Sequence, residues 1–91
     1  MLPLLRHNGN SWKCWVLGEA ALLIEPEFEG RRLDEIQKFV SCINAQKLNG
    51  LVDVVPAYAS IALFFNTKQW NHERLIQRLQ GNFLNAFGFE F

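Results

Sequence analysis

The feature that most constrains the fold is a repeated change in the spacing of apolar residues within a chain of 91 positions. Short runs rich in aromatic and branched residues are typical of strands, whereas apolar residues that recur every three or four positions indicate a helix with one buried face. Two strand-like runs precede each helix-like segment, which predicts strands at 12–17 and 20–25, a helix at 28–47, strands at 51–55 and 60–65, and a second helix after residue 71. The order ββαββα predicts a two-layer α+β domain whose antiparallel, four-stranded sheet carries both helices on one face.

The same spacing predicts which side of each helix is buried. In the first helix we expect the sheet-facing stripe to contain Phe39 together with Leu33, Ile36, Val40 and Ile43. Asn49-Gly50 supplies the left-handed stop that commonly follows a helix. Asn71 is expected to cap the second helix, whose buried face consists of Leu75, Ile76, Leu79 and Phe83. Gly81-Asn82 either ends that helix or weakens it.

The whole chain, 1–91, is expected to form a single domain with an irregular segment at each end. Residues 1–11 are interpreted as a loose arm that ends in a turn at Asn8-Gly9-Asn10-Ser11, and residues 12–84 form the ββαββα core. The segment 85–91 is a Phe-rich tail, which is unusual because free tails are normally polar. We therefore expect the tail to pack against its own core, a second copy or another domain, and the chain to form dimers or larger species.

Charge and composition exclude several classes of function. Nine basic and nine acidic side chains cancel and form no block of one sign, so the cationic surface that nucleic-acid binding requires is not expected. No apolar run approaches the roughly 18 residues of a membrane-spanning helix, and the N-terminus does not resemble a signal peptide. Two cysteines are too few for a disulfide framework, so the predicted location is the cytoplasm.

The sequence contains no recognisable catalytic set. His7 and His72 lack ligands at metal-binding spacing and are expected to be exposed, solvated imidazoles, whereas Cys14 and Cys42 are expected to be buried and inert. The glycines are scattered and form no phosphate-binding loop. We therefore predict no catalytic residue, no metal site and no cofactor, and whether the chain contributes to an enzyme depends on other subunits.

The segment Gly50–Ser60 has the highest density of unusual residues. Strand alternation places Val52 and Val54 on one face of the sheet, and Leu51, Asp53 and Val55 on the other. An Asp is rare in a strand, and a Pro is confined to a strand end or edge. One interpretation is a structural hairpin. The other is a recognition edge at which Asp53, Pro56, Tyr58 and Ser60 make the contacts.

Two segments resemble motifs of one known family. Residues 18–25, Gly-Glu-Ala-Ala-Leu-Leu-Ile-Glu, are similar to the "Gly-Asp-x-Ala-Leu-Leu-Val-Glu" opening of the 5-oxoprolinase B family, also called allophanate hydrolase subunit 1 or the sporulation kinase-inhibitor family. Residues 52–58, Val-Asp-Val-Val-Pro-Ala-Tyr, resemble its second motif, "Val-x-x-Val-Val-Pro-Ala-Tyr". The sequence departs from the family at Glu19, where Asp is usual, at Ala59, where Arg is common, and at Phe65-Asn66-Thr67, which replaces a "Tyr-Asp-Pro" turn.

The resemblance implies an assembly role. Members carry this domain ahead of a cyclophilin-like barrel, which is absent from the 91 residues, and act with partner subunits in the ATP-dependent opening of 5-oxoproline. It implies a non-catalytic binding domain whose contacts include Glu19, Asp53, Pro56, Tyr58 and Ser60 and whose partners are protein subunits or a missing C-terminal domain. One alternative is a module that inhibits a sensor histidine kinase. Another is a small-molecule-binding domain with the fold of pterin carbinolamine dehydratase. Whether the chain is truncated or a natural fragment stays open.

Overall fold

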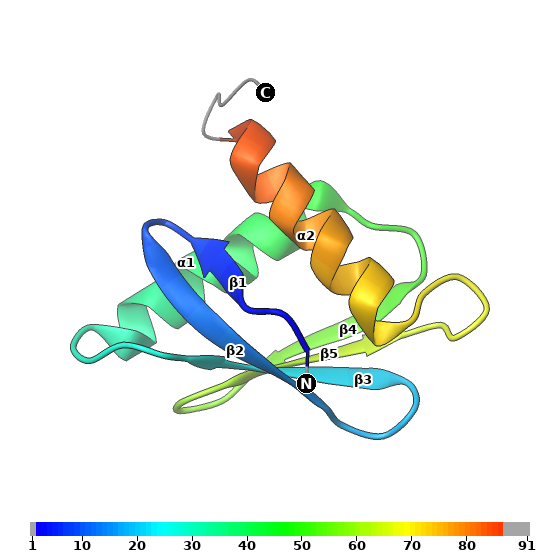
Figure 1. Cartoon of the computed structure of the whole chain (residues 1–91), viewed down its shortest axis with the longest axis horizontal. Helices are drawn as coiled ribbons and strands as arrows, with labels where there is room; N and C mark the ends of the chain where they lie inside the picture. The colour runs from blue at the N-terminus through cyan, green and yellow to red at the C-terminus, as the bar shows by residue number, and fades with distance from the viewer. Residues whose placement is uncertain (1, 87–91) are drawn as a thin grey trace.

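A computed structural model describes residues 2–86 of the chain, with side chains for residues 2–81. The elements follow one another as β1 (Leu5–His7), β2 (Asn10–Val16), β3 (Ala21–Pro26), α1 (Arg32–Gln46), β4 (Leu51–Pro56), β5 (Ile61–Phe65) and α2 (His72–Ala86). Figure 1 shows both helices on the same side of one twisted sheet. The predicted α+β class and the placement of both helices on one face are confirmed.

The sheet has the strand order β1-β2-β3-β5-β4, and every neighbouring pair is antiparallel. The β4–β5 pair therefore joins the β2–β3 pair through β5, and β4 lies at one edge of the sheet. The described part of the chain forms five strands, so the predicted four-stranded sheet is wrong by one strand. Within residues 2–86, neither helix is long and apolar enough to cross a membrane.

The additional strand, β1, comes from the segment that was expected to be a loose arm. Asn8 and Gly9 both have positive φ values, 55° and 79°, and join β1 to β2 in a tight hairpin. An Asn-Gly pair is the strongest short-range sequence signal for such a turn, because both of its central positions need a left-handed backbone. The signal is present in the sequence, but it predicts the turn without revealing the short strand that precedes it.

The first helix begins later than expected. Gly30 and Arg31 have φ values of 78° and 52°, so the chain turns through 28–31 and α1 starts at Arg32. Ile36, Phe39 and Ile43 are buried as predicted, but Leu33 is 52% exposed because it lies in the first turn, beyond the edge of the core. The helix ends at Gln46, and Lys47 rather than Asn49 takes the left-handed position that follows it.

The second helix agrees more closely with its prediction. Asn71 caps it, since the Asn71 side chain accepts a hydrogen bond of 2.8 Å from the backbone N–H of Arg74. Leu75, Ile76 and Leu79 are buried, and the helix continues through Gly81 to Ala86. The side chain of Phe83 and the tail residues 87–91 lie outside the described residues, so the predicted role of the tail stays a prediction.

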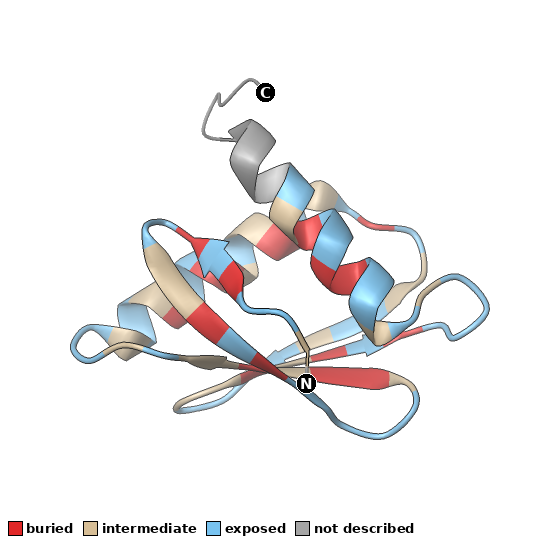
Figure 2. Ribbon diagram, viewed as in Figure 1, coloured by how far each residue is buried: buried red, intermediate tan, exposed pale blue. Residues whose placement is uncertain are grey.

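The core lies between the sheet and the two helices (Figure 2). Trp12 is fully buried at its centre and makes edge-to-face contacts with Phe39 at 4.6 Å and Phe28 at 5.2 Å. His7 is also buried and packs on Phe39 with ring centroids 4.7 Å apart. The prediction of a solvated His7 is wrong, because β1 directs this side chain inward rather than leaving it in a mobile arm.

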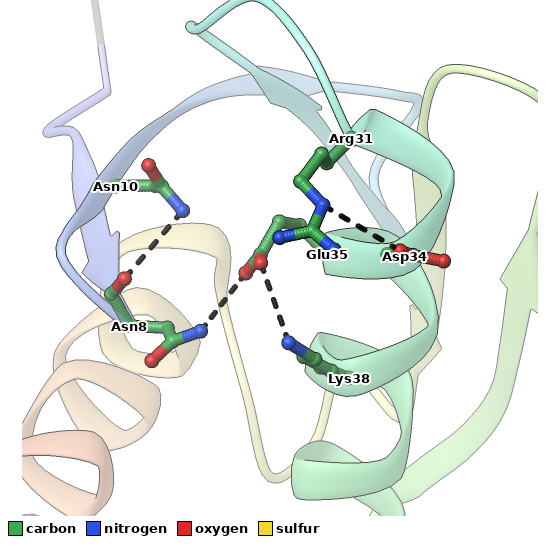
Figure 3. A network of polar contacts seen from close by, with 6 residues as sticks. All are labelled: Asn8, Asn10, Arg31, Asp34, Glu35 and Lys38. Atoms are coloured by element: carbon green, nitrogen blue, oxygen red, sulfur yellow. Dashed lines mark hydrogen bonds and ion pairs between the residues drawn. The ribbon is translucent and has the colours of Figure 1, made fainter.

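Polar contacts fix the β1–β2 turn against α1, as Figure 3 shows. The amide of Asn8 donates a hydrogen bond of 3.1 Å to the Glu35 carboxylate, which also forms an ion pair of 3.7 Å with Lys38. A second amide, that of Asn10, donates to the Asn8 carbonyl at 3.5 Å. The hairpin that holds His7 in the core is therefore attached to the helix that covers it.

Candidate functional site

The predicted binding residues do not form one cluster. Glu19 is exposed in the β2–β3 turn, whereas the β4–β5 hairpin carries Asp53, Pro56, Tyr58 and Ser60. The antiparallel register of β3 and β5 places that turn and that hairpin at opposite ends of the sheet. Tyr58 is 88% exposed at the hairpin tip. A partner that contacts both groups has to span the sheet, and the binding role of these residues stays a prediction.

A β-bulge changes the predicted faces of β4. Leu51 pairs with Phe65 and Asp53 with Phe64, so Val52 is the additional residue between them. The bulge places Leu51 beside Val54 on the core side, where both pack against the core. The prediction that Leu51 shares a face with Asp53 is therefore wrong, because simple alternation does not survive one inserted residue.

The free edge of β4 offers few hydrogen-bond donors. Ala57 N–H bonds to the Ser60 carbonyl at 2.8 Å, and alternation along the ladder then directs the N–H groups of residues 54 and 56 away from β5. The Asp53 carboxylate accepts the N–H of Val54 at 2.9 Å, and Pro56 has no N–H. Natural sheets use such features to block edge-to-edge pairing. A partner that uses Asp53 and Pro56 must therefore contact their side chains rather than add a strand.

The opposite edge, formed by β1, is closed by a different element. The Arg6 N–H donates to Gln80 Oε1 at 2.8 Å, and Gln80 Nε2 donates to the Arg6 carbonyl at 3.1 Å. The primary amide of Gln80 thus reproduces the pair of hydrogen bonds that a neighbouring strand would make. Local contacts therefore occupy part of each edge of the sheet, and the face opposite the helices is its remaining broad surface.

The middle of the sheet face opposite the helices is apolar, and Lys13, Glu25 and Asp53 lie around it on the same face. Cross-strand pairing aligns Trp15 with Leu23, Leu23 with Ala62 and Ala62 with Val55, which makes one row across four strands. Phe64 lies in the next row. Trp15, Val55 and Phe64 are 48%, 42% and 39% exposed, and Leu23 and Ala62 are half-buried. We call this surface the outer face, defined by Trp15, Leu23, Val55, Ala62 and Phe64.

A cleft adjoins the outer face at Trp15. It has a volume of about 650 Å³ and lies between the N-terminal segment and β2, where it is lined by Leu2, Leu4, Lys13, Cys14, Trp15, Val16 and Glu27. Leu4 and Val16 are 50% and 60% exposed. The apolar surface therefore extends from β4 across the sheet to the N-terminal segment.

The described residues hold little that could perform chemistry. They contain no cluster of three or more His, Cys, Asp or Glu side chains that could hold a metal ion. Burial raises the pKa of the Cys14 thiol to about 12, so this cysteine is inert, as predicted. Burial also lowers the pKa of His7, an effect that the Glu35 charge partly opposes.

The second histidine has a structural role rather than a solvated one. His72 Nε2 lies 2.8 Å from the Ala21 carbonyl and 3.0 Å from the Gly18 carbonyl, and two acceptors require the proton on this nitrogen. The contact attaches the start of α2 to the β2–β3 turn. The predicted solvated imidazole is therefore wrong for His72 as well.

The outer face was not predicted from the sequence. Its signal was the continuous apolar character of Ala20–Ile24 and Ile61–Phe65, because a strand with one solvated face is expected to alternate between apolar and polar residues. With both helices on one side, the second apolar side of these strands has no partner in the described part of the chain.

Comparison with known proteins gives one match. A family model, carboxyltransferase domain, subdomain C and D, matches residues 12–86. No curated protein and no solved structure matches the chain. The matched range contains both sequence motifs, most of β2, the three strands that follow it and both helices. The chain therefore belongs to the family of carboxyltransferase domains, subdomain C and D, which is found in the 5-oxoprolinase B and allophanate hydrolase subunit 1 family.

Proposed function

We propose that this chain is a non-catalytic assembly domain of a 5-oxoprolinase B-like protein and works with partner subunits. The apolar outer face is the observation that supports the proposal most directly. Three of its five side chains are more than a third exposed. The five side chains lie side by side in two neighbouring rows of the sheet rather than scattered. Contiguous apolar surface of this kind is typical of interaction sites, because leaving it in water costs free energy.

The described chemistry agrees with a binding role. The inert Cys14 and the two histidines serve packing and hydrogen bonding, so the described residues provide neither an activated nucleophile nor a general base with an evident partner. On this proposal the ATP-dependent chemistry belongs to the complete complex, and this domain holds other polypeptides in place.

Reconstitution with partner subunits tests the proposal. We expect the chain alone to leave ATP and 5-oxoproline unchanged, and the chain mixed with the partner subunits of a 5-oxoprolinase to form glutamate. Phe64→Glu is expected to lower this activity at limiting chain concentration, because it places a charge on the outer face. Leu33→Glu is the matched control, since Leu33 is 52% exposed on α1. Turnover by the chain alone, or full activity of the mixture without it, contradicts the proposal.

A further inference from the structure

We propose that the outer face binds a second copy of this chain, related by a twofold axis that runs parallel to the strands between β3 and β5. The inference rests on the proposed function, because it names the first partner of an assembly domain. Figure 1 shows that both helices lie on the other side of the sheet, so neither helix lies between two sheets that meet at this face. Face-to-face packing of two sheets is a common arrangement in folded proteins.

Edge-to-edge pairing is disfavoured by the contacts already present. Asp53 and Pro56 remove the free donors of β4, and Gln80 occupies the main-chain groups of Arg6 on β1. A second copy that adds as a strand would have to displace these contacts. Packing on the outer face requires none of these contacts to break.

The sizes of the side chains select the direction of the axis. The central row runs Trp15, Leu23, Ala62, Val55, so two large side chains are followed by two smaller ones. A twofold axis parallel to the strands reverses the row, which places Trp15 over Val55 of the second copy and Leu23 over Ala62. Large side chains then meet small ones, as close packing requires.

The neighbouring row has the same property. Ala21, which is only 3% exposed, pairs with Phe64 across β3 and β5, so the same axis places Phe64 of each copy over the small Ala21 of the other. Asp53, the β4 partner of Phe64, then lies at the edge of the contact. An axis perpendicular to the strands would instead place each residue over its own counterpart, Trp15 on Trp15 and Ala62 on Ala62. That arrangement combines crowding at one end of the row with an empty space at the other.

The net charge of the chain permits self-association, and the small area of the outer face limits the affinity of the dimer. The formal net charge is zero, so two copies do not repel one another as a whole. With strands about 4.8 Å apart and a rise of about 3.3 Å per residue, four strands give a face of roughly 20 by 20 Å. That footprint is at the low end for a specific interface, so we expect a dimer that dissociates at micromolar concentration.

Sedimentation of the 91-residue chain over a wide concentration range tests the inference. The native chain is expected to shift from monomer to dimer between about 1 and 500 µM, in line with the small interface. Trp15→Lys and Val55→Glu, each alone, are expected to raise the dissociation constant at least about tenfold, because each buries an unpaired charge. Leu33→Lys, on α1, is expected to leave it unchanged, and circular dichroism of each variant verifies the fold.

Mixing the two variants tests the axis itself. If Trp15 of one copy lies over Val55 of the other, an equimolar mixture of Trp15→Lys and Val55→Glu chains pairs the two opposite charges and recovers the dimer. A perpendicular axis predicts no recovery, since position 15 then never meets position 55. Lack of recovery overturns the proposed geometry, and a native chain that stays monomeric at about 500 µM overturns the dimer. A monomeric chain that still reconstitutes activity with partner subunits overturns this inference and leaves the proposed function standing.

Discussion

The side-chain amide of Gln80 completes the hydrogen bonding of Arg6, 74 residues away in the sequence, by accepting from its N–H at 2.8 Å and donating to its carbonyl at 3.1 Å. The contact joins the last helix to the first strand. It also occupies the main-chain groups of β1 that would otherwise be open to another strand. A three-residue strand at the edge of a sheet is weak by itself, and this contact gives it a partner on its second side.

Gln80→Leu is expected to lower the free energy of unfolding by about 1 kcal/mol, the usual net contribution of such hydrogen bonds near the surface. Urea unfolding followed by Trp fluorescence measures the change. Gln77→Leu, an exposed position on the same helix, is the control and is expected to change stability by less than about 0.5 kcal/mol. Equal effects of the two substitutions would mean that the Arg6 contact contributes nothing.

Gly50→Ala is expected to destabilise the fold by about 2 kcal/mol or more. Gly50 has a φ of +86°, which disfavours any side chain, and an added Cβ would lie 2.9 Å from Trp70 Nε1 and collide with the Gln69 amide. Trp70 cannot simply move away, because its indole N–H donates to the Asn49 carbonyl at 2.7 Å. Thermal unfolding measures the change.

Gly9→Ala separates the two causes of that destabilisation. Gly9 has a similar φ of +79°, but an added Cβ there meets no atom within 4 Å. Gly9→Ala is therefore expected to lower the free energy of unfolding by about 1 kcal/mol, the cost of placing an Ala in a left-handed backbone conformation. If Gly9→Ala is as damaging as Gly50→Ala, the collision with Gln69 and Trp70 is not the cause.

His7 makes stability depend on pH. Its pKa is lowered by burial in the folded state, so the unfolded chain binds a proton more readily than the folded chain does. The contribution of neutral His7 is therefore fully present above its ordinary pKa of 6.5 and is lost as the pH falls below that value. Urea midpoints measured about one pH unit above and one below that pKa should differ for the native chain. The difference should shrink in His7→Leu, and an unchanged pH dependence in this variant would exclude His7 as its source.

Tyr58→Ala is expected to leave the melting temperature within about 2 °C of the native value, because the side chain is 88% exposed. If the hairpin tip contacts a partner, the same change weakens binding by about 1–2 kcal/mol. Titration calorimetry of the purified partner subunits with the native chain and with the Tyr58→Ala chain measures the difference in binding free energy. Unchanged binding together with a lowered melting temperature would assign Tyr58 to the fold instead.

Much of the fold was determined by the sequence alone. Apolar spacing predicted two helices and four of the strands, because each periodicity reports local backbone geometry that a short segment carries by itself. The N-cap at Asn71 and the inert Cys14 were predicted for the same kind of reason, since a cap and a small buried hydrophobe depend on near neighbours. The two motifs indicated the family that the match over residues 12–86 then showed.

Only the tertiary structure decided what depends on residues far apart in the chain. The amide of Gln80 completes the edge of β1, the bulge at Val52 resets the faces of β4, and the turn at Asn8-Gly9 places His7 in the core. The outer face was also invisible to local reasoning. An apolar strand does not reveal whether one or both of its sides will be covered, and here both helices pack on the same side of the sheet, which leaves the row from Trp15 to Val55 open to another polypeptide.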